Sequence, residues 1–168
     1  RTSTMDWDVR PHPLLRNGHL QSVVGIHLPF DSTPHQAALH VIPTIDPTGR
    51  FDDERLALHE DRPDGWRPGD SIVLLIHGLA GCHQSTYMVR TAQRLLERGH
   101  AVFRLDMRGC GAGEGLARQP AHCGRGEDVR AALEYIAELH EQSPVQAVGF
   151  SLGGTLILNL LADLGEIK

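Results

Sequence analysis

Residues 147–158 read "AVGFSLGGTLIL" and are the most informative part of the sequence about its fold. An apolar run of strand-forming residues enters it and an apolar, helix-forming run leaves it. Between them lies a G-x-S-x-G pattern made by Gly149, Ser151 and Gly153. In this context the pattern is typical of a strained turn that lifts a serine hydroxyl out of a sheet, where a side chain in place of either glycine would clash.

The residues before this stretch predict further strands and helices in alternation. "SIVLLIHG", residues 71–78, is a continuous β-branched and aliphatic run, typical of a strand buried on both faces of a parallel sheet. The sequence further predicts a helix over 86–98 with Gly99 at its end, a strand over 100–106, a helix over about 126–141, a strand over 145–150 and a helix from residue 152. This order predicts an α/β fold with a mostly parallel sheet, flanking helices and right-handed crossovers.

The first 70 residues are rich in Pro, His, Asp and Arg and contain two short extended segments, 37–42 and 55–59. The second segment alternates polar and apolar residues, which predicts a half-exposed strand. Turn-forming residues at 62–70 separate it from the regular part. We therefore expect an N-terminal segment with short edge strands, 1–70, followed by the first half of an α/β core, 71–168, the two forming one incomplete domain.

Composition excludes several classes of protein. A formal net charge of −5 over 168 residues provides no basic surface for nucleic acid or an anionic membrane. The longest apolar run, 155–162, is too short to span a bilayer, and the first residues show no signal peptide. Three cysteines, an odd number without secretory context, favour reduced thiols in a cytoplasm. We expect a cytoplasmic protein with no nucleic-acid partner and no stable membrane span.

The serine turn predicts a nucleophilic serine. A serine hydroxyl becomes a nucleophile when a histidine takes its proton and a carboxylate orients that histidine. Ser151 is the predicted nucleophile. The helix that begins at Leu152 directs its first N–H groups and its dipole towards the place where an oxyanion would form.

A second N–H donor is expected from the loop after an earlier strand. The segment "HGLAG", 77–81, directly follows the strand at 71–76. Leu79 is the predicted donor and Ala80 the alternative, with Leu152 supplying the other N–H group. His77 and Gly78 are expected to support this loop.

Four stretches together resemble the α/β-hydrolase family that includes the bacterial YheT-type hydrolases and their eukaryotic ABHD-type relatives. They are "RNGHLQS" (16–22), "IHGLAGCHQSTY" (76–87), "LDMRGCGAGEG" (105–115) and "AVGFSLGGTL" (147–156). Their order and spacing match the family from about Leu14 onward, over the first half of such a protein. The resemblance implies a carboxylic-ester hydrolase for short- to medium-chain acyl esters or lipids, without a cofactor, that uses a Ser-Asp-His triad. It assigns the nucleophile to Ser151.

The acid and the histidine of that triad follow the serine in this fold, yet no histidine follows Ser151 in the sequence. We expect both residues, and further strands that cover the strand at 145–150, to lie beyond residue 168. Residues 1–168 alone are then expected to aggregate and to show no Ser151-dependent ester hydrolysis. Two alternatives stay open: an acyltransferase that forms the same acyl-enzyme, and a catalytically silent or binding chain.

Two other groups of residues could form a catalytic or metal site within the chain. His77 and Asp106 end the two preceding strands and offer a triad within the chain, but the expected chain order disfavours them. The pairs Cys82-His83 and His122-Cys123, with Cys110 between them, lack zinc-ligand spacing, so we expect no metal site.

The glycine run at 109–115 has Glu114 where a dinucleotide loop requires glycine, and it lacks the G-K-[ST] of a phosphate loop. Arg90, Arg94 and Arg98 predict a solvated helix face, with contact to an anionic lipid surface as the alternative. His19 in the first matching stretch is expected to be structural, with a place in an acyl pocket as its alternative.

Overall fold

The computed structural model describes residues 13–27, 37–46, 48–50 and 53–166. The chain divides into two compact units, Arg1–Asp31 and Ser32–Lys168. In the first unit a 3-10 turn, η1 (Pro13–Leu15), precedes the helix α1 (Gly18–His27). Asn17 caps this helix, because its side-chain oxygen accepts the His19 N–H at 2.9 Å. The stretch "RNGHLQS" thus contains a capped helix start, and the His19 side chain is exposed.

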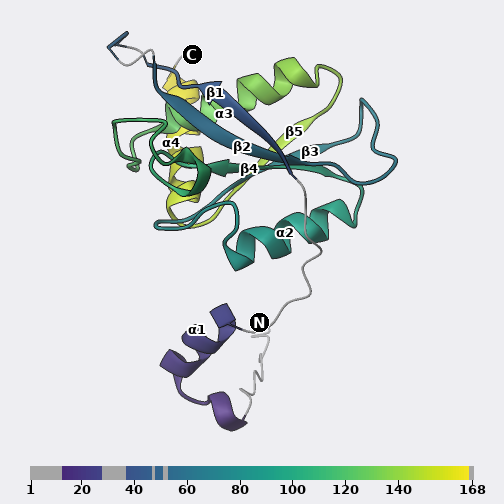
Figure 1. Cartoon of the computed structure of the whole chain (residues 1–168), viewed down its shortest axis with the longest axis vertical. Helices are drawn as coiled ribbons and strands as arrows, with labels where there is room; N and C mark the ends of the chain where they lie inside the picture. The colour runs from purple at the N-terminus through teal and green to yellow at the C-terminus, as the bar shows by residue number, and fades with distance from the viewer. Residues whose placement is uncertain (1–12, 28–36, 47, 51–52, 167–168) are drawn as a thin grey trace, which may run out of the picture. The chain divides into compact units, whose positions relative to one another are not determined.

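The second unit is built on a five-stranded mixed sheet (Figure 1). Its strands are β1 (Ala38–Pro43), β2 (Arg55–Asp61), β3 (Ile72–Ile76), β4 (Ala101–Asp106) and β5 (Val145–Gly149), in the order β1-β2-β4-β3-β5. β3 is parallel to its neighbours β4 and β5. β2 is antiparallel to both of its neighbours, β1 and β4. The predicted α/β class is confirmed, with the parallel part formed by the last three strands. The predicted division of the chain at residue 70 stays a prediction.

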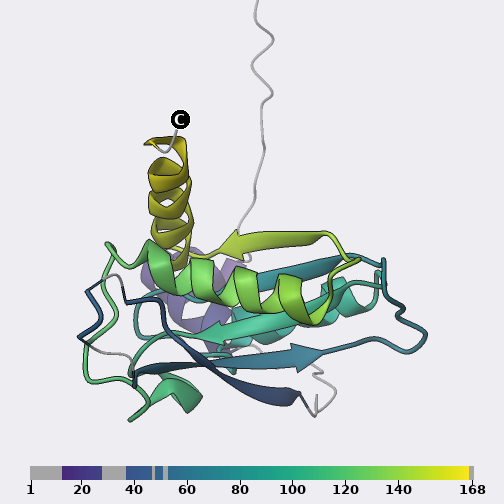
Figure 2. The same ribbon diagram turned by 90° about the horizontal axis from the view of Figure 1, so that it is seen from above.

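Helices cover both faces of the sheet. α2 (Thr86–Leu96) lies on one face, and α3 (Gly126–Leu139) and α4 (Leu152–Glu166) lie on the other (Figures 1 and 2). Successive side chains of β3 point to opposite faces, so Leu74 joins the core with α3 and α4 while Leu75 packs with α2. This explains the unbroken apolar run of the third strand, since it has no solvent-facing side.

The prediction of a half-exposed strand at 55–59 is wrong. From Leu56 to Asp61, every residue of β2 is buried, because β2 lies between β1 and β4. The polar side chains on the face opposite Leu56 and Leu58 have partners: His59 donates to Asp106 at 3.0 Å, and Asp61 accepts from Arg104 at 2.7 Å. Alternation of polar and apolar residues here separates an apolar core from buried polar pairs, and not a core from solvent.

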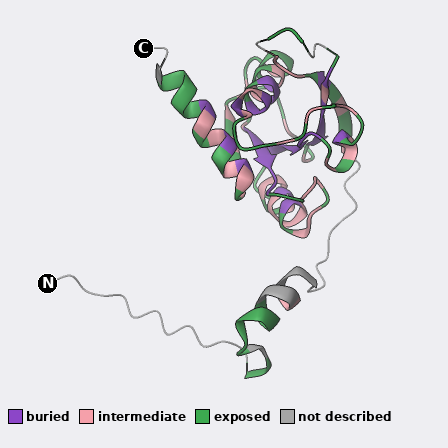
Figure 3. Ribbon diagram, turned by 90° about the vertical axis from the view of Figure 1, so that its left-hand side faces the viewer, coloured by how far each residue is buried: buried purple, intermediate pink, exposed green. Residues whose placement is uncertain are grey.

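β5 is the last strand of the sheet that the structure describes, and its surroundings are partly open. Val148 on this strand is 40% exposed. On α4, Leu158 is 67% exposed and Leu161 58% exposed, and the C-terminal turns of the helix are exposed as well (Figure 3). Strands beyond β5 stay a prediction.

Of the predicted arginine stripe, Arg90 and Arg94 lie on α2, and Arg98 lies just after its end. Arg94 and Arg98 are exposed and Arg90 is half-buried. Arg94 pairs with Glu97 at 3.3 Å, and the Arg98 guanidinium donates to the Arg94 carbonyl. These contacts fit a solvated helix face. Of the helices in the described part of the chain, none has the length and apolar character needed to cross a membrane.

A buried arginine joins three segments of the second unit. Arg108, in the loop after β4, pairs with Glu54 just before β2 and with Asp128 in the first turn of α3. Its Nε donates to Asp128 at 2.7 Å. Burial alone lowers the pKa of the guanidinium, but the hydrogen bonds and charges of Asp128 and Glu54 outweigh it and raise that pKa. Arg108 is therefore a permanently charged link between the sheet and α3.

Arg108→Ala is expected to lower the free energy of unfolding by about 3–5 kcal/mol, because it leaves two buried carboxylates without their cation. Denaturant unfolding followed by circular dichroism measures the loss. Arg130→Ala is the matched control: it removes an exposed pair with Glu134 and should cost less than about 1 kcal/mol. Equal effects of the two variants would show that Arg108 has no special structural role.

Candidate active site

The serine turn connects β5 to α4. Gly149 ends the strand, Leu152 begins the helix, and Ser151 between them has a φ of 50° and an exposed side chain. A positive φ is unfavourable for a residue with a β-carbon and persists only where the surroundings enforce it. Two backbone hydrogen bonds do so here: Phe150 N–H donates to the Ile76 carbonyl at 3.0 Å, and Gly153 N–H donates to the Phe150 carbonyl at 2.9 Å.

The two glycines of the pattern allow close backbone approaches. A β-carbon on Gly149 would lie 2.4 Å from the backbone of Gly153, and one on Gly153 would lie 2.5 Å from the Ile76 carbonyl oxygen. Both separations are shorter than any real carbon contact. The structure thus brings the predicted turn residues together and presses the start of α4 against the end of β3.

The loop after β3 lies beside the serine. A β-carbon on Gly78 would be 3.3 Å from the Ser151 β-carbon, so "HGLAG" and the serine turn are in contact. The loop is a tight turn in which Gly81 N–H donates to the Gly78 carbonyl at 3.0 Å and Ala80 has a φ of 56°. Gly78 N–H donates to the Tyr87 hydroxyl at 2.9 Å. The N–H groups of Gly78 and Gly81 are therefore engaged, which leaves those of Leu79 and Ala80 as the predicted donor and its alternative.

His77 is a buried, fully bonded histidine. Its Nε2 lies 3.1 Å from the Met107 N–H, which can only donate, so Nε2 accepts. Its Nδ1 then carries the proton and donates to the Gly78 carbonyl at 2.7 Å. Because both ring nitrogens are used in hydrogen bonds that hold the loop, the residue is poorly suited to act as a base.

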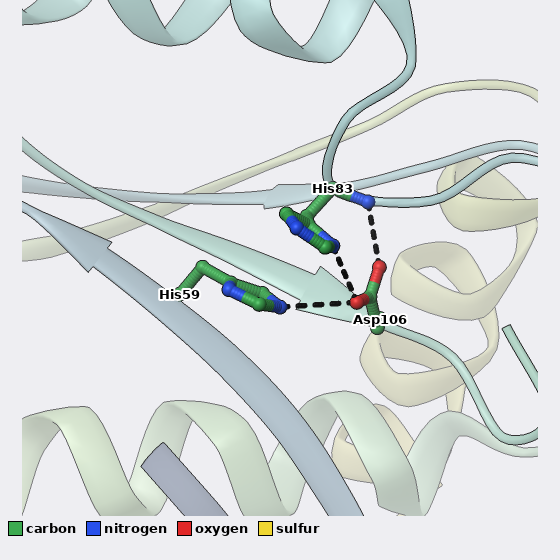
Figure 4. A group of neighbouring side chains, drawn as sticks. All are labelled: His59, His83 and Asp106. Atoms are coloured by element: carbon green, nitrogen blue, oxygen red, sulfur yellow. Dashed lines mark hydrogen bonds and ion pairs between the residues drawn. The ribbon is translucent and has the colours of Figure 1, made fainter. Parts of the chain in front are cut away.

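Asp106 likewise lies at the end of its strand, but its carboxylate binds other groups. Its side chain is completely buried and accepts His59 Nε2–H at 3.0 Å and His83 Nδ1–H at 2.6 Å (Figure 4). The backbone N–H groups of His83, at 2.6 Å, and Ala112, at 2.8 Å, also donate to it. No hydrogen bond between the described residues joins a histidine or Asp106 to the Ser151 hydroxyl, so the triad alternative within the chain gains no support.

The charge of this carboxylate is fixed by its donors. Burial alone raises the pKa of Asp106, but the bonds from His59 and from the backbone N–H groups, with the charge of His83, bring it down to about 2. Burial lowers the pKa of His83, against the opposing effect of Asp106. The two imidazoles stack with ring centroids 3.5 Å apart.

Asp106 also tethers the loop beside the serine. His83 ends the segment that contains the Gly78–Gly81 turn, and both its backbone N–H and its ring donate to the carboxylate. Its carbonyl accepts from the Arg104 guanidinium at 2.8 Å. With His77 bonded to Met107 at the other end, the loop is anchored at one end to β4 and at the other to the residue that follows it.

The glycine run at 109–115 has a packing role in the structure. Gly111 and Gly113 lie in the short turn η2 (Gly111–Gly113), and a β-carbon on Gly111 would lie 2.5 Å from the Asp106 carboxylate. A β-carbon on Gly113 would lie 2.8 Å from the Met107 carbonyl. The run lets this turn press against the end of β4.

Sequence reasoning missed His59 and considered His83 only as half of a Cys82-His83 pair. The signal for His83 and Asp106 was present, since Asp106 ends one parallel strand and His83 lies in the loop after its neighbour, and the carboxyl ends of these strands meet at one edge of the sheet. His59 could not be found in this way because its position depends on the antiparallel register of β2 against β4, where it lies opposite Arg104. Cys82, Cys110 and Cys123 are free thiols.

A serine at positive φ between a parallel strand and a helix, next to a glycine turn after the neighbouring strand, defines the nucleophile-elbow class of α/β proteins. The sequence model of the alpha/beta hydrolase fold matches residues 71–166. The chain belongs to the α/β-hydrolase fold family, as the resemblance implied.

Curated proteins are similar to this chain over a limited stretch. Phospholipase ABHD3 from Mus musculus is 32% identical over 95 residues, which is 56% of this chain and 23% of that protein. The Escherichia coli (strain K12) protein YheT is 30% identical over 94 residues, covering 56% of this chain and 28% of YheT. Medium-chain fatty acid ethyl ester synthase/esterase 2 of Saccharomyces cerevisiae is 29% identical over 96 residues and is covered to 21%. The match thus spans about a quarter of each relative.

Solved structures support the fold. A serine hydrolase without a lid from Xanthomonas campestris superposes with a TM-score of 0.58 at 23% identity, over 79% of this chain and 59% of that one. The esterase Pf2001 from Pyrococcus furiosus gives a TM-score of 0.63 at 19% identity, over 79% and 47% of the two chains. At these identities the likeness concerns the fold alone.

Gly149→Ala is expected to destabilise the second unit by at least about 2 kcal/mol, because its β-carbon would overlap backbone atoms that cannot move aside. Thermal and denaturant unfolding measure the change. Gly165→Ala is the control: this glycine lies in α4 with no atom within 4 Å of its would-be β-carbon, and alanine favours helix. A stable Gly149→Ala protein would contradict the tight turn described above.

Proposed function

We propose that the protein is a serine-dependent carboxylic-ester hydrolase with Ser151 as its nucleophile. The observation that carries the proposal is the exposed serine at positive φ, held between β5 and α4. It contacts Gly78 of the loop after β3, residues 77–81, which we call the glycine loop. The strain of such a turn is tolerated at functional sites because it presents the hydroxyl to a substrate.

The proposed reaction is acyl transfer in two steps. The Ser151 oxygen attacks the ester carbonyl while an imidazole base takes its proton. The imidazolium then gives that proton to the departing oxygen, and the alcohol leaves as the tetrahedral intermediate collapses to the acyl-enzyme. Water then attacks the acyl-enzyme and releases the acid. The base and its carboxylate are additional residues that the proposal requires, since His77 and Asp106 are engaged elsewhere.

Backbone N–H groups stabilise the intermediate in this proposal. Leu152 is the first residue of α4, where helical N–H groups have no partner within the helix and the dipole is positive. Leu79 provides the second N–H from a loop that is anchored at both ends. Donors that need no rearrangement during the reaction are the effective ones.

The substrate class follows from the relatives' names. A phospholipase and an ethyl ester synthase/esterase for medium-chain fatty acids both act on acyl esters, so we propose short- to medium-chain acyl esters or lipids. The name of the yeast relative combines synthesis and hydrolysis of esters. It favours acyl transfer to an alcohol as the second candidate, because an alcohol in place of water resolves the same acyl-enzyme.

The nucleophile is tested by labelling the natural protein from its source with a fluorophosphonate, which modifies activated serines. We expect one adduct, mapped by peptide mass spectrometry to Ser151 and lost in Ser151→Ala. Ser143→Ala, which removes another hydroxyl of the second unit, should keep the adduct. A protein without an adduct, or with the adduct on another serine, would refute the assignment.

The oxyanion donor is tested with Leu79→Pro. Proline has no N–H but suits the second position of a turn of this kind, so the turn should persist. We expect kcat for a p-nitrophenyl ester to fall by about 10²–10³ while Leu79→Ala, which keeps the N–H, retains most of the rate. An unchanged rate in Leu79→Pro would transfer the role to Ala80.

A further inference from the structure

Three potential metal ligands from separate segments converge beside the glycine loop. They are His59 in the middle of β2, His83 in the loop before α2 and Asp106 at the end of β4 (Figure 4). We propose that these residues bind one divalent transition-metal ion of the zinc type. The proposal is independent of the esterase reaction and departs from the expectation, based on sequence spacing, that the chain has no metal site.

The distances fit an ion with little movement of the donor atoms. The two histidine nitrogens and the carboxylate oxygen all lie within 4.8 Å of one another. The nitrogens of His59 and His83 lie 3.0 and 2.6 Å from Asp106 Oδ2. Ligands about 2.0–2.2 Å from a tetrahedral Zn²⁺ lie roughly 3.3–3.6 Å apart. Each nitrogen would therefore have to move away from Asp106 Oδ2 by about 1 Å or less to admit the ion.

The charge of the site also calls for a cation. The Asp106 side chain is completely buried, and both of its ion-pair partners in the described part of the chain are histidines. An imidazole brings a positive charge only when both of its ring nitrogens carry protons, whereas a divalent metal ion is always charged. The nearest arginine of β4, Arg104, is paired with Asp61 at 2.7 Å. Because buried charges are normally paired or bound to metal, a divalent ion would complete this site.

The surroundings already hold the carboxylate as they would hold a ligand. Asp106 Oδ1 accepts the His83 N–H, and Oδ2 accepts the Ala112 N–H. Backbone donors of this kind orient ligating carboxylates in metal sites. Gly111 admits the turn that carries Ala112, since a β-carbon there would strike the carboxylate.

One rearrangement is required. The rings of His59 and His83 are nearly parallel, with an interplanar angle of 13°, so their nitrogen lone pairs cannot both point at one ion. The His83 ring, 15% exposed and carried by a loop, is the one expected to turn. Each ring also moves its proton to the other nitrogen, because neutral imidazole binds a metal through its unprotonated nitrogen.

A ligand set of two imidazole nitrogens and one carboxylate oxygen favours some metal ions over others. Mg²⁺ and Ca²⁺ prefer sites made wholly of oxygen, whereas Zn²⁺ and its first-row neighbours bind imidazole together with carboxylate. Three protein ligands leave one position of a tetrahedral zinc for water. Zn²⁺ is therefore the probe of choice.

The test uses tag-free protein, stripped with a chelator and titrated with Zn²⁺ in a calorimeter. We expect one ion per chain. His59→Gln and His83→Asn keep a side-chain N–H near the position from which each imidazole bonds to Asp106, but remove the ligand. Each should lower the affinity at least about 100-fold, because loss of partners outside the ligand set already costs roughly 10- to 100-fold.

His122→Ala is the matched control, because His122 is exposed and neighbours Cys123, a rival place for zinc. It should leave the affinity unchanged. Absence of saturable one-to-one binding, or unaltered binding in both His59→Gln and His83→Asn, would overturn the proposal. Binding that disappears with His122→Ala would also overturn it.

A second measurement needs no variant and so does not depend on their folding. Long-range ¹H–¹⁵N spectra of the histidine rings report which nitrogen carries the proton or a metal. Zn²⁺ should change the ring nitrogens of two histidines, assigned to His59 and His83, and leave His77 as it is. Changes confined to other histidines would refute the site.

Discussion

The buried carboxylate of Asp106 is the interaction on which the functional edge of the sheet depends. An ionised group with no exposed surface must be satisfied entirely by protein donors, and here they come from β2, from the loop after β3 and from the turn after β4. The loop after β3 and the turn after β4, unlike β2, contribute little to the apolar core, so these bonds are what fixes them. The loops around the serine are thus held by polar contacts, whereas the sheet beneath them is held by its apolar core.

The serine turn depends on a different constraint, the close approach of backbones. Gly153 reaches the end of β3 and Gly149 reaches Gly153, at distances that no β-carbon permits. Since the end of β3 also begins the glycine loop, the turn and the loop share one boundary at Ile76 and His77. The relative position of Ser151 and Leu79 is therefore set by the sheet itself and does not require ordering by a substrate, as electrostatic stabilisation of an intermediate demands.

The sequence predicts those features that depend on local pattern. The strands at 71–76, 100–106 and 145–150 and the helices after them are found where period and glycine placement predicted them, because each is decided within a few residues. The burial of β2 was mispredicted, since the same alternation serves a solvent face or a face of buried polar pairs. The cluster of His59, His83 and Asp106 depends on strand order and antiparallel register, which no local pattern encodes. The catalytic roles of Ser151, Leu79 and Leu152 stay predictions.

The glycine loop links the two constraints. Gly78 at one end touches the serine turn, and His83 at the other end is bonded to Asp106 through its backbone as well as its ring. The ring can leave its stack on His59 while the backbone bond to Oδ1 remains, because the two bonds use different carboxylate oxygens. A cation between the histidines and Oδ2 would then alter the ring of His83 without releasing the loop that carries Leu79. The backbone bond would thus let the proposed metal site and the proposed oxyanion loop share the same few residues.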